Sequence, residues 1–283
     1  MSEELRREYE IGAEIGRGRF GVVRRCTSLS SGEPFAVKSV DKSLLADPID
    51  CECAELEAKT TLLAGAGNPA VVQIHAIFED QASIHLVMDL VDGPDLFEWI
   101  RLRLGSPPSE PEAADVVAQI AAALAACHRR GVAHRDVKPD NVLLDRGGRV
   151  RLADFGSAAG FGCGRRMTGL VGTPFYVAPE VVRGEEYGEK VDVWSAGVVM
   201  YVMLSSGEAA PFYGETAEET FKAVLRGNLR FPASIFAGVS PAAKDLMRRM
   251  MCKDVSRRFS AEQVLMHPWI TSGGGLGAEE EQS

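Results

Sequence analysis

Two groups of polar residues in the middle of the chain have the types and spacing needed to handle a phosphoryl group. The first is the run His-Arg-Asp-Val-Lys-Pro-Asp-Asn from His134 to Asn141, and the second is Asp154-Phe155-Gly156. Phosphoryl transfer needs an acceptor for the hydroxyl proton, metal ligands that bridge the phosphates, and a cation near the developing charge. The candidates are Asp136 for the proton, Asn141 and Asp154 as oxygen ligands of Mg²⁺, and Lys138 for the γ-phosphate charge.

The alternative for both groups is that they are turn residues that cap loops. Asp154 follows Asp136 by 18 residues (154 minus 136), and both groups come after a glycine-rich segment and a lysine in a strand-like run. This order is typical of a phosphotransferase, and turn chemistry alone does not require it. We therefore favour the catalytic interpretation.

The glycine-rich segment is Gly16, Gly18 and Gly21 followed by Val23, which has the spacing G-x-G-x-x-G-x-V. Glycines allow backbone amides to approach phosphate oxygens closely. A structural hairpin or a dinucleotide-binding turn has similar spacing, but the latter requires a helix directly after the glycines. Here the strand-like run 35–38 follows, which favours a loop that covers nucleotide phosphates.

Lys38 closes the apolar run Phe35-Ala36-Val37 and therefore needs an anionic partner. Nucleotide phosphates and a glutamate from a nearby helix would supply one. Three glutamates compete for this role: Glu52, Glu55 and Glu57. We prefer Glu57 because of its distance to the Leu62-Leu63 pair and Pro69, while a solvated acidic helix face accounts for at least two of the three.

The pattern of elements predicts two lobes of different construction. Short β-rich runs between Ile11 and Leu90 are interrupted by one helical stretch at 51–64, and long helical periodicity begins after the turn at 92–94. We predict an α+β bilobal fold, with a small five-stranded antiparallel sheet and one helix at 1–91, a mainly helical lobe at 92–270, and a disordered Gly/Glu-rich tail at 271–283.

The clearest helix starts after Ser109, which forms a capping-box pattern with Glu112, and it stops before Gly131. Its apolar stripe is spaced by three and four residues, as expected for a helix that packs in a core. The stripe consists of Val117, Ile120, Leu124 and Cys127. Further helices are expected at 191–204, 217–226, 241–251 and 261–266.

Composition excludes several classes of protein. The 283 residues carry a net charge of -9, which argues against a nucleic-acid-binding face and is compatible with basic peptide substrates. No apolar run approaches the roughly 20 residues of a membrane span, and the first ten residues lack the apolar centre of a secretory signal. The six cysteines show no zinc-site spacing, so we expect reduced thiols. We expect a cytoplasmic protein, with the nucleus as the alternative location, and a monomer.

These motifs together resemble those of eukaryotic protein kinases over essentially all of residues 9 to 270. Ala178-Pro179-Glu180 resembles the end of the kinase activation segment, and Asp192 and Arg258 match later landmarks. The resemblance implies that Asp192 braces the catalytic loop and that Arg258 pairs with Glu180. It also implies ATP and Mg²⁺ as cofactors, with adenine between Val23, Ala36 and Leu143, a gatekeeper at Met88 and a hinge at 89–91. The implied nucleotide-binding residues are Ile15, Gly16, Gly18, Gly21, Val23, Ala36, Lys38, Glu57, Met88, Asp89, Val91 and Leu143. For Val23 and Leu143 taken singly, a plain core role is equally good.

Lys138 and Thr173 fit the serine/threonine pattern of the kinase family, and Leu90 to Phe97 resembles the hinge of calcium/calmodulin-dependent kinases. In that group an acid at the Asp95 position reads a basic residue before the phosphosite, with Asp140 as a second carboxylate. The alternative is a pair of ordinary surface acids.

Three segments of the second lobe, 212–219, 226–232 and 252–263, are similar to those of plant phosphoenolpyruvate carboxylase kinases. This resemblance implies phosphoenolpyruvate carboxylase as the protein substrate, phosphorylated on a serine near its N-terminus. We expect no calmodulin binding and no direct calcium control, because the chain has no basic amphipathic target, no Asp-x-Asp-x-Asp-Gly loop, and little sequence after Ile270.

The activation segment departs from the common pattern at Arg165-Arg166-Met167-Thr168-Gly169. Arg135 would pair with a phosphorylated Thr168, but we favour a segment that is ordered without phosphate. Cys163 is either a redox-active loop thiol or, as we favour, an unreactive surface cysteine. Rival functions are a pseudokinase scaffold, a small-metabolite phosphotransferase, and a kinase with basic peptide preference and another substrate.

Overall fold

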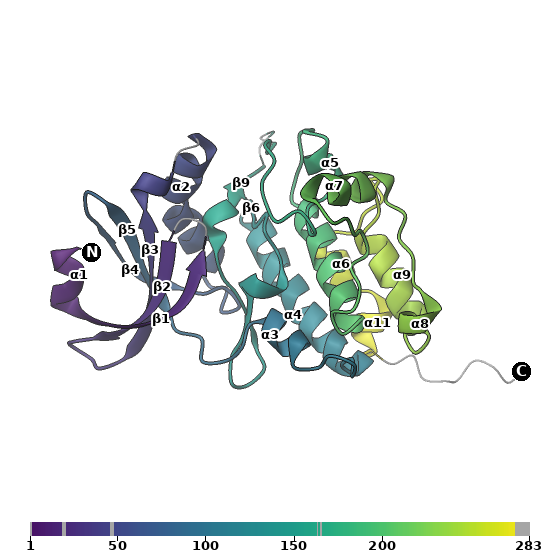
Figure 1. Ribbon diagram of the computed structural model, residues 1–283, viewed down its shortest axis with the longest axis horizontal. Helices are drawn as coiled ribbons and strands as arrows, with labels where there is room; N and C mark the ends of the chain where they lie inside the picture. The colour runs from purple at the N-terminus through teal and green to yellow at the C-terminus, as the bar shows by residue number, and fades with distance from the viewer. Residues whose placement is uncertain (1, 19–20, 46–47, 163, 165, 275–283) are drawn as a thin grey trace, which may run out of the picture.

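The computed structural model describes residues 2–18, 21–45, 48–162, 164 and 166–274, and Figure 1 shows a sheet-based lobe followed by a larger helical lobe. The first lobe contains an antiparallel sheet of five strands in the order β1-β2-β3-β5-β4. The strands are β1 (Tyr9–Gly18), β2 (Gly21–Ser28), β3 (Pro34–Asp41), β4 (Ile74–Glu79) and β5 (Ser83–Asp89). Helix α2 (Pro48–Gly65) lies between β3 and β4 in sequence. The predicted bilobal α+β fold is confirmed.

The first lobe also has a short helix, α1 (Glu3–Glu8), that the sequence analysis did not anticipate. Its sequence is charged except for one apolar residue, Leu5, and Leu5 is fully buried. Leu5 packs in a small cluster with Cys26, Val37, Phe78 and Val87. The charged start of the chain therefore completes the outer core of the sheet, which one apolar residue in a charged run cannot signal.

The register of the sheet places several predicted nucleotide-binding residues on one face. Val23 lies directly opposite Lys38, and Ala36 lies directly opposite Met88. Ala36 and Lys38 are two residues apart on β3, and side chains two apart point to the same side of a strand. Three neighbouring strands thus present Val23, Ala36, Lys38 and Met88 on a common surface.

The second lobe is mainly helical. It contains α3 (Leu96–Arg101), α4 (Glu110–Arg129), α5 (Pro179–Val182), α6 (Lys190–Leu204), α7 (Ala217–Arg226), α8 (Ala233–Phe236), α9 (Pro241–Met250), α10 (Ala261–Leu265) and α11 (Pro268–Thr271). Helices were expected at five of these positions, whereas α3, α5, α8 and α11 are too short for periodicity to reveal them. No helix in the described part of the chain is long and apolar enough to span a bilayer.

The two longest helices of this lobe form its core. Ser109 and Glu112 make both hydrogen bonds of the capping box at the start of α4, and the predicted stripe of α4 is buried. Helix α6 is buried on nearly every side, as its continuous apolar sequence requires. It packs between α4 and α9 in the middle of the lobe.

Glu110 fastens the last helices to α4. Its carboxylate accepts hydrogen bonds from Ser240 N at 2.5 Å, Ser240 Oγ at 2.7 Å and Trp269 Nε1 at 2.6 Å. Gly274 is buried at φ +82°, where a Cβ would lie 2.2 Å from Glu110 O. The predicted disordered tail starts at 271, but 271–274 form the end of α11 and a turn; 275–283 lie outside the described residues.

Candidate active site

Lys38 of β3 joins the sheet to α2 and to the segment that begins at Asp154. Its Nζ lies 2.5 Å from Glu57 Oε1 and 2.7 Å from Asp154 Oδ1. Glu57 is buried on α2, and Lys38 is largely buried. The structure thus places Lys38 beside the preferred glutamate; the side chains of Glu52 and Glu55 lie outside the described residues.

The two carboxylates keep Lys38 charged. Burial alone would lower the pKa of Lys38, but the negative charges of Glu57 and Asp154 outweigh burial and raise the pKa above its ordinary value. Burial likewise acts to raise the pKa of Asp154, and the Lys38 ammonium overcomes it, so the pKa of Asp154 is lowered. The site therefore holds a fixed cation next to an ionised acid, as binding of a metal–triphosphate requires.

The backbone around Asp154 is shaped for this contact. Asp154 has φ 59° and ψ 73°, a left-handed conformation that is costly for most non-glycine residues. The 3₁₀ turn η3 (Phe155–Ser157) follows and contacts α2. A Cβ on Gly156 would lie 3.2 Å from Asp154 Oδ1 and 3.3 Å from Glu57 Oε2, so glycine lets this turn approach the three charged groups closely.

Asp136 is held by a second network of hydrogen bonds. Its Oδ1 accepts from Thr173 N at 3.0 Å and from Thr173 Oγ1 at 2.8 Å, while Lys138 Nζ lies 2.8 Å from its Oδ2. Lys138 also donates to Thr173 Oγ1 at 2.9 Å. The structure therefore brings together the three predicted catalytic residues of this region, although they come from two segments.

Asn141 and Asp154 fit a magnesium site that is completed by a nucleotide. Asn141 lies in the 3₁₀ turn η2 (Pro139–Asn141), and its Nδ2 donates to Asp136 O at 2.8 Å, which orients the amide oxygen away from that contact. Among the described residues, no three His, Cys, Asp or Glu side chains could hold a metal by themselves. Mg²⁺ is usually bound through one or two protein oxygens plus phosphates and water, so these residues fit such a cofactor.

The catalytic loop is anchored by a buried carboxylate from α6. Asp192 is fully buried, and its oxygens accept from His134 N and Arg135 N, both at 2.8 Å. His128 Nε2 of α4 lies 2.8 Å from Asp192 Oδ2. Burial acts to raise the pKa of Asp192, but the hydrogen bond from His128 and the backbone donors prevail and lower it. The sequence analysis missed His128, because a histidine at a helix end is most simply a C-terminal cap.

The glycines of the β1–β2 hairpin differ in what surrounds them, and therefore in why glycine is suitable at each position. Gly18 pairs with Gly21 across the turn between β1 and β2; residues 19 and 20 lie outside the described residues. A Cβ on Gly21 would lie 2.0 Å from Ser39 O, so packing against β3 requires glycine there. A Cβ on Gly18 would meet no atom within 4 Å, and one on Gly16 would meet only Val23 Cβ at 3.8 Å. At these two positions glycine leaves room for a ligand.

The predicted adenine-binding residues come from both lobes. Ala36 is buried, and Val23 and Met88 are half-buried on the shared face of the sheet, whereas Ile15 is 47% exposed on β1. Leu143 is the middle residue of β7 (Val142–Leu144), which pairs with β8 (Val150–Leu152) in the second lobe. A ligand between these groups would touch both lobes.

The hinge residues Asp89 and Val91 line a different cavity. This cavity of about 400 Å³ is formed by the start of β3, the hinge and the β7–β8 turn, and none of Lys38, Asp136 and Asp154 lines it. The Asp89 side chain bonds to His75 Nε2 at 2.7 Å and accepts from Gln73 N at 3.1 Å. Leu90 lines this cavity too, so a contact between the hinge and a nucleotide at Lys38 would have to use backbone atoms.

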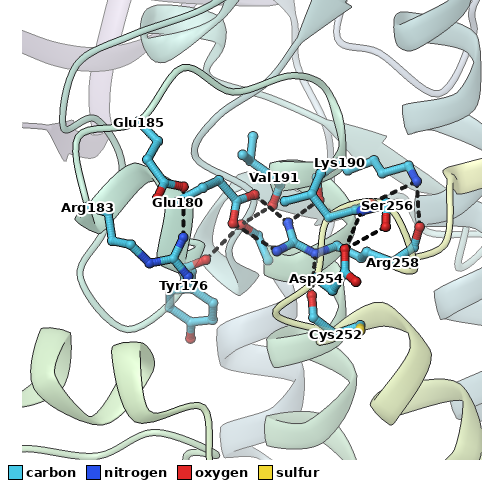
Figure 2. Close-up of polar contacts among 12 residues, drawn as sticks. Tyr176, Glu180, Arg183, Glu185, Lys190, Val191, Cys252, Asp254, Ser256 and Arg258 are labelled. Carbon is cyan, nitrogen blue, oxygen red and sulfur yellow. Dashed lines mark hydrogen bonds and ion pairs between the residues drawn. The ribbon is translucent and has the colours of Figure 1, made fainter.

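A buried ion pair between Arg258 and Glu180 holds helix α5 in place. Arg258 Nη1 and Nη2 donate to Glu180 Oε1 and Oε2 at 2.6 and 2.8 Å (Figure 2). Both side chains are almost completely buried. Arg258 Nε also donates to Cys252 O at 2.9 Å. A two-point contact of this kind fixes the position of α5 relative to the helical core.

The two acids expected to read a basic residue lie on neighbouring segments. Asp95 precedes α3, Asp140 lies in η2, and α3 contacts η2. Asp95 also caps α3, because its side chain accepts from Glu98 N at 2.7 Å. Asp95 therefore stabilises the start of α3, in addition to any role in substrate binding.

A family model described as protein kinase domain matches residues 9–270. Calcium-dependent protein kinase 19 of Arabidopsis thaliana is 39% identical over 276 residues, which cover 96% of this chain and 49% of that protein. Serine/threonine-protein kinase PEPKR2 of the same plant is 40% identical over 263 residues, covering 93% and 53%. Calcium-dependent protein kinase 8 of Oryza sativa subsp. japonica is 39% identical over 270 residues, covering 94% and 49%.

The chain spans about half the length of the curated relatives that it matches. Within that span, the match to the family model covers both lobes and every segment that contributes to the site. The chain therefore belongs to the protein kinase family, and the relatives that it matches include a serine/threonine-protein kinase.

Proposed function

We propose that this chain transfers the γ-phosphoryl group of ATP to serine or threonine residues of a protein substrate. Asp136 orients the acceptor hydroxyl and takes its proton, and Lys138 balances charge on the γ-phosphate. Asn141 and Asp154 hold Mg²⁺, while Lys38, fixed by Glu57, contacts the nucleotide phosphates.

The observation that carries this proposal is the meeting of two networks where the lobes join. Lys38, Glu57 and Asp154 form one, and Asp136, Lys138 and Thr173 form the other. Asn141 joins them, because its Nδ2 donates to Asp136 O at 2.8 Å and its backbone carbonyl accepts from the N–H of Ala153, next to Asp154, at 3.0 Å. Its side-chain oxygen is a suitable ligand for Mg²⁺. Such an arrangement has the cation, metal ligands and base of a phosphotransferase within one site.

We further propose that the substrate carries a basic residue before the phosphorylated position. Asp95 and Asp140 supply the carboxylates for it, and a carboxylate pair can hold a guanidinium through charge-assisted hydrogen bonds. Burial raises the pKa of Tyr176, and the negative charges of Asp140 and Asp136 raise it further, so both acids lie near this residue. The net charge of -9 favours the approach of a basic peptide.

The specific substrate that we propose is phosphoenolpyruvate carboxylase, at a serine near its N-terminus. The similarity of segments 212–219, 226–232 and 252–263 to plant kinases of that enzyme supports this choice. We also propose that these 283 residues act without calcium, because they contain no Asp-x-Asp-x-Asp-Gly loop. The matched calcium-dependent kinases share only about half their length with this chain, so their calcium control does not carry over to it directly.

One assay tests these proposals together. The purified chain is incubated with labelled ATP, Mg²⁺ and either a basic serine peptide or phosphoenolpyruvate carboxylase, with calcium or with a chelator. Asp136→Asn serves as the matched inactive control. We expect equal labelling with and without calcium, and mass spectrometry should place the phosphate on an N-terminal serine of the carboxylase.

The outcomes separate the alternatives. Labelling of the peptide but not of the carboxylase would mean that a different basic substrate is used. Nucleotide binding without labelling of either would favour a scaffold that does not catalyse transfer. A strict calcium requirement would refute the proposed calcium independence and leave the kinase assignment intact.

A further inference from the structure

Tyr187 occupies an unusual position between the activation segment and the catalytic loop. Only 3% of its surface is exposed, and it lies just before α6. Its backbone pairs with Met167, with Met167 N to Tyr187 O at 3.0 Å and Tyr187 N to Met167 O at 2.9 Å. This bridge brings its side chain to the part of the activation segment where phosphorylation of Thr168 would act.

The hydroxyl of Tyr187 connects two segments that carry function. It donates toward the backbone carbonyls of Thr168 at 3.1 Å and Gly169 at 3.0 Å, and it accepts from Arg135 Nη1 at 3.3 Å. Arg135 and the backbone of Thr168 therefore meet at one hydroxyl. Thr168 itself exposes its side chain to solvent.

Arg135 also contacts the segments that carry the catalytic residues. It has φ 65°, its backbone N–H donates to Asp192, and its Nε donates to the carbonyl of Ser157, the last residue of η3. Its carbonyl oxygen would lie 2.6 Å from a Cβ on Gly172, so the activation segment crosses directly over it. Gly172 precedes Thr173, which bonds to Asp136.

We propose that Tyr187 is a positioning residue that orders the activation segment without phosphate. In many kinases an arginine bound to a phosphorylated residue orders this segment. Here the buried hydroxyl of Tyr187 joins Arg135 to the activation segment instead. The fixed activation segment then holds Thr173, which follows Gly172, in hydrogen-bonding distance of Asp136. The inference rests on the proposed kinase activity, and it adds that this activity needs no phosphate at Thr168.

The first test uses the unmodified chain. After phosphatase treatment, with absence of phosphate at Thr168 checked by mass spectrometry, the wild type and Thr168→Val should phosphorylate a basic peptide at equal rates. A loss of activity on dephosphorylation that ATP restores would overturn the inference. A wild type that never labels any peptide would instead refute the proposed function itself.

The second test removes the hydroxyl alone. Tyr187→Phe should lower kcat/KM for the peptide by about 3- to 10-fold, as expected for the loss of one or two hydrogen bonds that fix a catalytic geometry. KM for ATP should not change, because Lys38, Glu57 and Asp154 make no contact with Tyr187 in the described contacts. This split between peptide and nucleotide distinguishes positioning from general destabilisation.

A matched control comes from Tyr201 on α6. It is equally buried, and its hydroxyl donates to Arg230 O at 2.9 Å, away from the catalytic loop. Tyr201→Phe should lower the melting temperature by a similar amount and leave peptide kinetics unchanged. Equal kinetic effects of Tyr187→Phe and Tyr201→Phe, or no effect of either, would overturn the inference.

A rescue experiment gives a further readout. In the Tyr187→Phe background, Thr168→Glu adds a carboxylate, as a substitute partner for Arg135, at the residue whose backbone carbonyl the tyrosine hydroxyl bonds. We expect this second change to restore most of the lost kcat/KM, whereas Thr168→Gln should not restore it. Identical behaviour of the glutamate and glutamine variants would show that charge at Thr168 does not replace the hydroxyl.

Discussion

Lys38 Nζ and Glu57 Oε1 lie 2.5 Å apart, in a contact that fixes α2 against β3. Glu57→Gln keeps the shape of the side chain and removes its charge, so Lys38 is left with Asp154 alone and shifts toward it. Because small displacements of a positioned group can cost up to about 10²-fold, we expect kcat/KM for ATP to fall by about 10- to 100-fold. Steady-state kinetics with varied ATP measure this change.

The matched control is Glu79→Gln. Glu79 pairs with Lys42 at 2.6 Å, but its side chain is 65% exposed. An exposed pair contributes little to stability, and this pair does not reach the site, so ATP kinetics should stay at the wild-type level. If Glu57→Gln behaved in the same way, the Lys38–Glu57 contact would have no role in nucleotide use.

Asp136→Asn tests the proton acceptor. The amide keeps hydrogen bonding to Thr173 possible and removes the base, so we expect kcat to fall by about 10²- to 10⁴-fold. Mg-ATP affinity, measured by calorimetry, should remain close to wild type because Asp136 is not proposed to bind the nucleotide. Near-normal turnover would rule out Asp136 as the base.

Asp154→Asn tests the metal ligand. Removing the charge weakens Mg²⁺ binding, and we expect the Mg²⁺ concentration for half-maximal activity to rise at least about tenfold. Titration of activity against Mg²⁺ at saturating ATP measures it, with Asp136→Asn as the comparison that should keep the wild-type half-point. An unchanged half-point in Asp154→Asn would contradict the ligand assignment.

Arg258→Met tests the buried pair with Glu180. Removal of one partner leaves an uncompensated buried carboxylate, which costs about 3–5 kcal/mol in the free energy of unfolding. Arg183→Met is the control, because Arg183 pairs with Glu185 at 2.7 Å with both side chains partly exposed, and its loss should cost about 0–1 kcal/mol. Denaturant unfolding compares the two variants. Equal losses in the free energy of unfolding would show that burial does not make the Arg258–Glu180 pair more important for stability than the exposed pair.

Stability should depend on acid through Asp192. Its pKa in the folded chain is lowered, so its contribution is fully present above the unfolded value of about 3.9 and is lost as the pH falls through the folded pKa. Asp192→Asn cannot titrate, so its free energy of unfolding should fall less steeply than that of the wild type between about pH 5 and about pH 3, the range around that unfolded pKa. Denaturant curves at several pH values measure the two slopes, and parallel slopes would contradict this.

The lobes and the long helices could be predicted because their signals are local. The capping box of Ser109 and the apolar stripe of α4 act within one helix, and both are present in the structure. The order of the glycine loop, Lys38 and the two aspartate motifs likewise predicted which residues approach one another. The preference for Glu57 rested on spacing alone, and its side chain lies beside Lys38.

Contacts that depend on tertiary packing could not be predicted. Leu5 is buried only because α1 folds over the sheet, and Asp89 turns toward His75 only because β4 and β5 pair at the hinge. Tyr187 and His128 carry no motif of their own. Their importance follows from partners 52 and 64 residues away, which one sequence does not reveal.

The contacts of Glu110 impose an order on assembly during synthesis. Its partners at Ser240 and Trp269 follow 130 and 159 residues later in the chain. At translation rates of about 5–20 residues per second, Trp269 is made roughly 10 to 30 seconds after Glu110. During that interval α4 is without its final cover, so a nascent chain on the ribosome exposes apolar surface to which chaperones can bind.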